Sequence, residues 1–395
     1  MSSINERNTL SNQELDTLKK QSVLIPTPYY EPAHLGGGPI RTLKALVEAA
    51  PENFEVKIVC LNHDFGTTED LVPKSNEWVR HGKATINYTD GGLRVFYDAL
   101  RLTKCVDILY LNSFFNAQFT ILPIFLSITK VIKNRKILIA PRGEFDPGAL
   151  KFSAAKKKIY INLFKFLHLH HKVIWHASSS LEAHHIQNVF GEHTKILVRE
   201  NETSLPLMAT TRAKRSTDPV TLLFASRLHE KKGLHILLGA LQGISTQINL
   251  NIVGKFEDPS YAEKCRSLAS ALPSNFKVSF IGALPHESVL EHFRKADLFV
   301  FPTAGENFGH VIAESLSQSC PVMCSDNTPW NKVLKSGGGY VVPSLSIDEW
   351  SSELMKFLKN GNKLLEQSSL NAGESYNAWR LESKGEHIFR MIENL

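Results

Sequence analysis

The chain has 395 residues, of which 43% are hydrophobic and 21% are charged. This is the composition of a soluble globular protein with enough residues for two domains of ordinary size. The formal charge of +6 suits an anionic ligand or an anionic membrane surface and does not decide between them. Because no nucleic-acid-binding motif accompanies this charge, we expect no nucleic-acid partner.

Short apolar segments alternate with longer helical patterns after a polar N-terminal tail. Residues 1–21 lack the apolar centre of a secretory signal, so we expect a frayed tail and a cytoplasmic protein. The predicted strands are Ser22–Thr27, Val56–Leu61, Ile108–Asn112, Lys136–Ala140, Val173–Ala177, Val220–Ala225, Ile248–Val253, Lys277–Ile281, Leu298–Pro302 and Pro321–Ser325. This alternation predicts an α/β fold built from parallel sheets with helices on both faces.

A glycine run follows the first predicted strand. Gly36, Gly37 and Gly38 precede a helix predicted over Pro39–Ala50, and Pro39 suits its first turn. Glycine lets the backbone approach a ligand closely, although the spacing is not that of the dinucleotide-binding fingerprint. We expect Gly37 and Gly38 to line the diphosphate side of a ligand cleft; a plain surface loop is the alternative.

The most apolar stretch of the chain is Phe114–Ile132. Polar residues and a proline interrupt it, whereas a membrane-spanning helix needs about 20 nearly uninterrupted apolar residues. We therefore predict a buried helix. The five cysteines have no metal-binding or redox spacing, which favours buried, inert thiols in a reducing compartment: Cys60, Cys105, Cys265, Cys320 and Cys324.

Polar residues follow two strands of the first half. Arg142 and Glu144 come at the end of the strand Lys136–Ala140, where parallel sheets bind ligands, and Glu144 could also pair with Arg142 as structure. Asn112 and Ser113 end the preceding strand and are weaker candidates for acceptor contacts.

A basic helix is predicted over Lys156–Lys172. One arc carries Tyr160, Leu163, Phe164, Leu167 and Leu169, and the opposite arc carries Lys158, Asn162, Lys165, His168 and His171. No Asp or Glu accompanies these histidines at metal-ligand spacing, so we expect no metal. The helix either only packs on the first sheet or also docks its basic face weakly, in a salt-sensitive way, on anionic lipid.

A segment without periodicity, residues 203–219, separates the two halves and is predicted to be a linker. The domains are then 22–202 and 220–375, each a Rossmann-like, doubly wound unit, followed by a C-terminal helix over 376–395. Ligands of such folds bind at the carboxyl ends of the strands, so two facing domains would share one cleft.

Two cations follow the strand Val220–Ala225. Arg227 and Lys232 lie in the loop that opens a helix over Leu234–Leu241, and Lys231 competes with Lys232 for the same role. Arginine binds phosphate oxygens as a fork and lysine as a point charge, so the loop predicts a pyrophosphate site. A solvated charge cluster is the alternative.

The most informative segment is Gly305–Ser315. Glu306 lies in a turn after a buried strand, and Glu314 follows after seven residues, on the next helix. Backbone N–H groups at Phe308 and Gly309 open that helix and can bind an anion, while a carboxylate can accept hydrogen bonds from sugar hydroxyls. Phosphate and sugar together indicate a nucleotide-sugar; solvated acids at a helix start are the alternative.

This segment resembles the Glu–seven residues–Glu pattern of the retaining glycosyltransferases of family 4, also called group 1. The resemblance reaches from Ser226–Gly233 to Gly337–Gly339, and covers the first half only loosely. It implies the glycosyltransferase B fold, with Glu306 beside the transferred sugar, Glu314 on the ribose hydroxyls, and Arg227 and Lys232 on the donor phosphates. In relatives the last helix returns to the first domain. Many relatives carry a His at the position of Arg142. A subset has the sequence Pro-Arg-Gly instead, as this chain does, and implies that Arg142 supports the acceptor or the donor phosphate.

The implied activity is metal-independent transfer of a hexose-type sugar from a nucleotide diphosphate sugar to a hydroxyl acceptor, with retention and without a cofactor. No Asp-x-Asp pair for Mg²⁺ occurs, and Glu306 and Arg142 are the expected catalytic residues. The expected acceptor is a saccharide or lipid-linked saccharide of lipopolysaccharide or other surface-polysaccharide synthesis, at the inner face of the membrane. Two alternatives stay open: a nucleotide-sugar epimerase on a similar fold, and a non-catalytic nucleotide-sugar-binding subunit.

Overall fold

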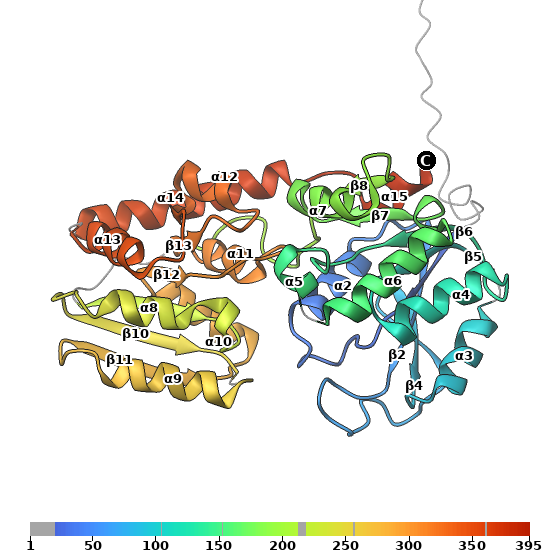
Figure 1. The fold of residues 1–395 in the computed structure, drawn as a ribbon, viewed down its shortest axis with the longest axis horizontal. Coiled ribbons are helices and arrows are strands. Elements are labelled where there is room, and N and C mark those ends of the chain that lie inside the picture. Colours follow the sequence, from blue (N-terminus) through green and yellow to red (C-terminus); the bar gives the residue numbers. More distant parts are fainter. Residues whose placement is uncertain (1–19, 104, 152, 212–218, 256, 360–361) are drawn as a thin grey trace, which may run out of the picture. The chain divides into compact units, whose positions relative to one another are not determined.

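The computed structural model of the protein describes residues 20–103, 105–151, 153–211, 219–255, 257–359 and 362–395. The chain divides into two compact units (Figure 1). The N-terminal unit holds the residues up to Ser204 together with Glu386–Leu395, and the C-terminal unit holds Leu205–Gly385.

The N-terminal unit is built on an eight-stranded sheet in the order β3-β4-β2-β1-β5-β6-β7-β8. Its strands are β1 Gln21–Pro26, β2 Phe54–Leu61, β3 Trp78–His81, β4 Ala84–Thr89, β5 Cys105–Leu111, β6 Lys133–Ile139, β7 Ile174–Ala177 and β8 Ile196–Val198. All pairings are parallel except that of β3 with β4. The five predicted strands are confirmed. The sequence missed β3 and β4, a hairpin with an exposed edge, and β8, which has only three residues.

Helices cover both faces of this sheet. They are α2 Gly38–Glu48, α3 Leu93–Leu102, the π-helix η1 Ala117–Ile121, α4 Leu122–Ile128, α5 Pro147–Lys151, α6 Ala154–Phe166, the 3-10 helix η2 Leu169–His171, α7 Ser180–Phe190 and α15 Ile388–Glu393. Phe114 anchors the core under α6, with ring centroids 5.0 Å from Phe164 and 5.4 Å from Trp175.

Two helices of this unit differ from the sequence prediction. The expected helix Lys156–Lys172 ends at Phe166, because His168 adopts a left-handed backbone conformation (φ 54°). Leu163 and Leu167, expected in the core, are exposed instead, since the buried face of α6 is centred on Phe164. The expected buried helix Phe114–Ile132 is a π-helical turn followed by α4, which exposes Phe125.

None of the helices in the described residues is both long and apolar enough to cross a membrane. Four cysteines are buried as expected; Cys105, the first residue of β5, is exposed, contrary to the prediction.

The C-terminal unit has a six-stranded, all-parallel sheet in the order β11-β10-β9-β12-β13-β14. Its strands are β9 Val220–Ala225, β10 Ile248–Val253, β11 Phe276–Gly282, β12 Leu298–Phe301, β13 Val322–Ser325 and β14 Gly339–Val342. The five predicted strands are confirmed, and only the short β14 was missed. The order reverses between β9 and β12, which makes this pair the topological switch point of a doubly wound fold.

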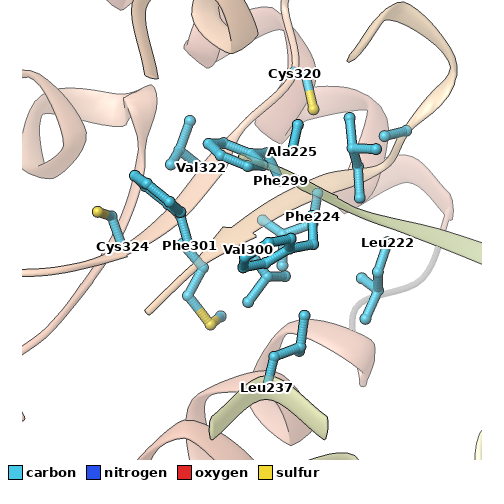
Figure 2. Packing of buried hydrophobic residues seen from close by; sticks show 14 of the residues in the cluster. Leu222, Phe224, Ala225, Leu237, Phe299, Val300, Phe301, Cys320, Val322 and Cys324 are labelled. Atoms are coloured by element: carbon cyan, nitrogen blue, oxygen red, sulfur yellow. The ribbon is translucent and has the colours of Figure 1, made fainter. Parts of the chain in front are cut away.

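Its helices are the 3-10 turn η3 Glu230–Lys232, α8 Leu234–Leu241, α9 Pro259–Ser270, α10 His286–Lys295, α11 His310–Ser317, α12 Asn331–Val333, the π-helical turn η4 Leu334–Gly338, α13 Ile347–Leu358 and α14 Asn362–Glu382. Figure 2 shows the core at the switch point, where side chains of β9, β12 and β13 pack together. The rings of Phe299 and Phe301 stack with centroids 5.3 Å apart. Every residue of β12 is buried, which fixes the strand whose end carries the candidate site.

The C-terminal segment joins the N-terminal unit later than expected. The helix α14 stays in the C-terminal unit, because the ring of Trp379 packs 4.6 Å from that of Trp330 and the Tyr376 hydroxyl donates to the carbonyl of Pro206. Only residues from Glu386 onward belong to the N-terminal unit, rather than a helix from 376. There Phe389 of α15 packs 5.6 Å from Phe54.

Candidate active site

The candidate site of the C-terminal unit lies in the loops that follow β9 and β12, the two strands of the switch point. A glycine brings these loops together. Gly233 has φ +75°, and a Cβ on it would lie 1.9 Å from the carbonyl oxygen of Pro302, at the end of β12. The backbone N–H of Ala304 donates to the carbonyl of Lys231 (2.8 Å). The turn η3 therefore packs directly on the segment that leads to Glu306.

This packing places Lys232, not Lys231, beside Glu306. The Lys232 Nζ lies 2.5 Å from Glu306 Oε1, and the two side chains are only 17% and 14% exposed. The Thr303 hydroxyl donates to the same carboxylate oxygen (2.8 Å), and the Lys232 ammonium lies 5.5 Å above the ring of Phe301. A cation and a carboxylate with so little solvent interact strongly, and either can exchange its partner for a charged or polar ligand.

The turn between Glu306 and α11 is held by residues further along the chain. The Glu306 N–H donates to the carbonyl of Asn327 (3.1 Å), and the Trp330 indole donates to the carbonyl of Phe308 (2.5 Å). Gly309 caps α11 with φ 78°, a conformation suited to glycine. The first N–H groups of a helix have no partner within the helix, which is why the sequence analysis expects an anion at this turn.

Glu314 lies in the second turn of α11, as predicted, and its side chain is only 6% exposed. Its Oε1 atom is 3.4 Å from Nε2 of His286, the first residue of α10. The sequence analysis missed His286, because this contact is set by the packing of α10 on α11 and leaves no short-range pattern.

Arg227 follows β9, as predicted, but its side chain is 67% exposed and its guanidinium lies 3.2 Å from the carboxylate of Glu257. Glu257 follows β10, so this ion pair joins two neighbouring strand ends of the same sheet. An exposed ion pair of this kind contributes little to stability and can open to a ligand.

In the N-terminal unit, Arg142 is bound into a polar network at the ends of β5 and β6. Its guanidinium donates to Asn112 Oδ1 (2.7 Å), to the Tyr110 hydroxyl (2.7 Å) and to the side-chain oxygen of Asn201. The Tyr110 hydroxyl also contacts Nδ1 of His176 (3.0 Å). Burial, reinforced by the nearby Arg142, lowers the pKa of His176 to about 3.

Glu144 is not the partner of Arg142 that the sequence suggested. Its carboxylate accepts hydrogen bonds from the Ser113 hydroxyl (2.7 Å) and the Phe114 N–H (2.5 Å), because the chain after β5 turns over it. Burial raises the pKa of Glu144, while these hydrogen bonds act in the opposite direction. Ser113 is thus a structural contact, and Asn112 supports Arg142.

Gly37 and Gly38 lie at the start of α2, where Gly37 is the cap residue with φ 70°. The loop before them is anchored by Asp64, which accepts hydrogen bonds from the N–H groups of His34 (2.7 Å) and Leu35 (3.0 Å). The sequence analysis did not identify Asp64. Gly37, Gly38 and Arg142 belong to the N-terminal unit, whereas the contacts around Lys232 and Glu306 join residues of the C-terminal unit.

Within the described ranges of the chain, no group of three or more His, Cys, Asp or Glu side chains is placed to hold a metal ion.

Comparison with known proteins relates this geometry to a family. Residues 210–374, which include Arg227, Lys232, Glu306 and Glu314, match the sequence profile of the glycosyl transferases group 1. A phosphatidyl-myo-inositol mannosyltransferase of Mycobacterium leprae is 32% identical over 146 residues, 35% of this chain and 37% of that protein. An uncharacterized glycosyltransferase of Methanocaldococcus jannaschii is 30% identical over 110 residues, 27% of each chain. The matched region thus spans about a third of the length of these curated relatives.

Solved structures are similar over almost the whole chain. The Anabaena protein HepE, in complex with UDP and glucose, has a TM-score of 0.70 at 15% identity and covers 95% of this chain and 100% of its own. Sucrose-phosphate synthase of Thermosynechococcus elongatus has a TM-score of 0.71 at 16% identity, with the same coverage. These similarities confirm the glycosyltransferase B fold that the sequence predicted.

Proposed function

We propose that this chain transfers a sugar from a nucleotide diphosphate sugar to a hydroxyl group, with retention at the anomeric carbon. The match of residues 210–374 to the glycosyl transferases group 1 supports this proposal. The observation that carries the proposal is the contact of Lys232 with Glu306 at the switch point of the C-terminal sheet. In such a donor, Lys232 would contact the diphosphate and Glu306 would contact the sugar, on the two sides of the bond that breaks.

In this proposal the donor diphosphate binds the cationic loop after β9. Lys232 turns from Glu306 toward a phosphate oxygen, and Arg227 leaves Glu257 to do the same. The N–H groups at Phe308 and Gly309 complete the anion site. Because the leaving diphosphate gains negative charge as the glycosidic bond breaks, these groups stabilise the transition state more than the bound donor.

The two glutamates have different parts. Glu306 holds the transferred sugar and offsets the positive charge that develops on its ring. Glu314 binds the ribose hydroxyls, and His286 positions its carboxylate. The leaving phosphate can take the acceptor proton, so no protein base is required. The acceptor oxygen bonds to the anomeric carbon on the face from which the diphosphate leaves, which gives retention without a protein nucleophile. Gly37 and Gly38 are proposed to approach the diphosphate from the N-terminal unit, and Arg142 to support the acceptor or the donor phosphate.

The acceptor we propose is a saccharide or a lipid-linked saccharide used in lipopolysaccharide or another surface polysaccharide. The name of the Mycobacterium leprae relative, a mannosyltransferase acting on a phosphatidylinositol, supports a lipid-linked acceptor. A cytoplasmic enzyme at the inner face of the membrane would meet both substrates there. It would need no metal, because Arg227, Lys232 and the N–H groups supply the positive charge.

A panel of nucleotide-sugars in a thermal-shift assay tests the donor first. A ligand that binds only the folded protein stabilises it by RT ln(1 + [L]/Kd), about 2.7 kcal/mol at 100 times Kd. We expect one nucleotide diphosphate sugar to exceed the others, and its free nucleoside diphosphate to shift the melting temperature more than the nucleoside does.

Turnover of that donor then separates the alternatives. We expect nucleoside diphosphate release to depend on an added acceptor, to persist in EDTA, and to give a product with the donor's anomeric configuration. Interconversion of the sugar without acceptor would identify an epimerase. Binding without turnover of any acceptor would identify a subunit that only holds the donor.

A further inference from the structure

The helices α4 and α6 expose an unusual amount of apolar surface. On α6, Ile159 is 68% exposed and Phe166 is 77% exposed, and Leu163 lies between them at helical spacing. On α4, Phe125 is 59% exposed, and Ile128 follows three residues later. The opposite faces of both helices already pack on the core, where Phe164 of α6 and Leu126 of α4 are buried. These exposed side chains therefore do not serve the packing of the sheet.

The two helices lie on one face of the N-terminal sheet. α4 connects β5 to β6 and α6 leads from β6 toward β7, and these strands are successive neighbours in the sheet. Right-handed crossovers that advance in the same direction put their helices on the same face. Figure 1 shows α4 and α6 next to each other in the N-terminal unit.

A cavity of about 210 Å³ opens between α4 and the turn that follows α6. Its walls are mixed: Ile124 and Ile128 from α4 and Leu169 from η2 are apolar, whereas Ser127 and Asn134 are polar. Arg135 and Lys172, at the amino-terminal ends of β6 and β7, also line it, and Arg135 contacts Asp107 (3.3 Å). Arg142 follows the other end of β6, so this cavity is separate from the ligand-binding edge of the sheet. A cavity that combines apolar side chains with polar groups and two cations suits an amphiphile with a negative headgroup.

The segment that contains α4 and α6 carries far more positive than negative charge. Between residues 108 and 181 the chain has eleven Lys and Arg but only two acids, Glu144 and Asp146, a formal charge of +9 against +6 for the whole protein. Glu144 faces inward to the turn after β5, and Asp146 caps the start of α5. Lys156 and Lys158 are exposed beside Ile159 on α6, and Lys172 is exposed beside the cavity.

We propose that this surface docks on an anionic lipid bilayer. The lipid-facing surface consists of apolar side chains on α4, on α6 and in the turn after it, with flanking lysines: Phe125, Ile128, Ile159, Leu163, Phe166, Leu167, Lys156, Lys158 and Lys172. The apolar residues enter the boundary between headgroups and acyl chains, and the lysines bind the anionic headgroups. The cavity accepts part of one lipid. Charge complementarity favours a bilayer over a second copy of this chain, whose corresponding surface would carry the same positive charge.

This docking differs from the purely electrostatic contact expected from the sequence. Only two of the three consecutive lysines are exposed, because the Lys157 ammonium donates to the carbonyl of Ala149 (2.7 Å) and lies 5.1 Å from the centre of the Phe115 ring. The apolar side chains should therefore retain part of the binding when salt screens the lysines. Under the proposed function, docking would bring the protein to its lipid-linked acceptor. Docking itself does not depend on the sugar donor and can be measured without it.

Flotation of the full chain with vesicles of phosphatidylglycerol and phosphatidylcholine tests the proposal. We expect at least tenfold stronger binding to these vesicles than to phosphatidylcholine alone, with part of it remaining at high salt. Ile159→Ser/Phe166→Ser should lower the binding about tenfold. Leu93→Ser/Leu381→Ser is the matched control, since both leucines are more than 60% exposed on other helices, and it should bind like the parent.

The charges are tested by Lys156→Glu/Lys158→Glu, with Lys277→Glu/Lys335→Glu in the C-terminal unit as its control. We expect the first pair alone to abolish the preference for anionic vesicles. Absence of vesicle binding by the parent, or equal binding by the parent and Ile159→Ser/Phe166→Ser, would overturn the proposal. Self-association of the parent that this serine pair removes, without any vesicle binding, would instead make the surface an interface between copies. Transfer to a water-soluble acceptor is measured separately, so its failure would affect the proposed function alone.

Discussion

The two units of this protein use the ends of their strands differently. In the C-terminal unit, side chains from two loops turn toward each other, and Lys232 meets Glu306 at a place where each can change partner. In the N-terminal unit, the guanidinium of Arg142 is already bound by Tyr110, Asn112 and Asn201. The first arrangement pairs two charges that the proposed function assigns to the donor, and the second binds one charge to three neighbouring side chains.

This difference suggests a division of labour. The family profile matches residues 210–374, which lie in the C-terminal unit, and the proposed function assigns the donor to this unit. The proposal assigns the acceptor to the N-terminal unit, where loops at the strand ends can change while the sheet is kept. The comparison makes separate predictions for substitutions in the two units.

The largest effect is expected in the C-terminal unit, from Glu306→Gln. The substitution keeps the shape of the side chain and removes the charge that would offset the developing charge of the sugar. We expect kcat to fall by about 100-fold or more, with donor affinity within a few-fold of the parent. Steady-state kinetics and donor calorimetry measure the two effects. A lower melting temperature with unchanged kcat would mean that the Lys232 pair is only structural.

A large effect of another kind is expected in the N-terminal unit, from Arg142→Ala. Asn112, Asn201 and Tyr110 would each lose a charged donor, and an unsatisfied buried group costs about 1–3 kcal/mol. We expect a lower free energy of unfolding together with a lower kcat, and little recovery in Arg142→Lys, whose ammonium cannot reproduce the fork. If the folded fraction of Arg142→Ala kept the full kcat of the parent, Arg142 would not be a catalytic residue.

The sequence could predict the C-terminal site because its residues lie in two short segments. Glu306, Phe308, Gly309 and Glu314 all follow a single buried strand, and local spacing alone places them on one turn and one helix. The contact with Lys232 needs only the adjacency of β9 and β12, which is the usual arrangement of a doubly wound sheet. Sequence reasoning failed at His286 and Asp64, since each acts through packing between distant elements.

The same limit explains the helix α6. Its sequence carries apolar residues all round, so periodicity does not fix which of them face the core. The predicted arc was right for Phe164 and Leu169 and wrong for Leu163 and Leu167. The predicted strands are short apolar runs in alternation with helical patterns, whereas β8 has only three residues and β14 begins with a glycine, so neither gives a clear apolar run.

A smaller effect, about tenfold, is expected from removing a phosphate-binding charge. Lys232→Met and Arg227→Met should weaken the binding of nucleoside diphosphate and leave the binding of the nucleoside almost unchanged, because the proposed function places both cations on phosphate oxygens. Calorimetry with both ligands on each variant measures this. An equal loss for the two ligands would place these residues elsewhere on the donor.

A few-fold effect is expected at the ribose. Glu314→Ala should raise the KM for the donor with little change in kcat, because ribose contacts are the same in the ground state and the transition state. His286→Ala should do the same more weakly, and His286→Gln, which keeps a polar N–H group close to Glu314, should recover part of the loss. A fall in kcat without a change in KM would contradict the ribose assignment.

The smallest effect at neutral pH concerns His176 and grows only on acidification. Its pKa is lowered from 6.5 to about 3 in the folded protein, so below pH 6.5 the unfolded chain takes up a proton that the folded chain does not. Its contribution to stability is complete above that pH and is lost as the pH falls toward 3. The melting temperature of the parent should therefore fall more steeply between pH 6.5 and 4 than that of His176→Gln. Parallel curves would show that other groups govern the acid response.

The close contact of Gly233 with Pro302 has a consequence for changing the enzyme by design. With 1.9 Å to the carbonyl, no side chain fits at this position without separating η3 from the end of β12. Lys232 and Glu306, the proposed contacts of the phosphate and the sugar, are therefore held together by this backbone contact, and a larger residue at position 233 would separate them. Libraries that seek a new sugar preference should leave residues 231–233 and 302–306 fixed and vary the side chains around them.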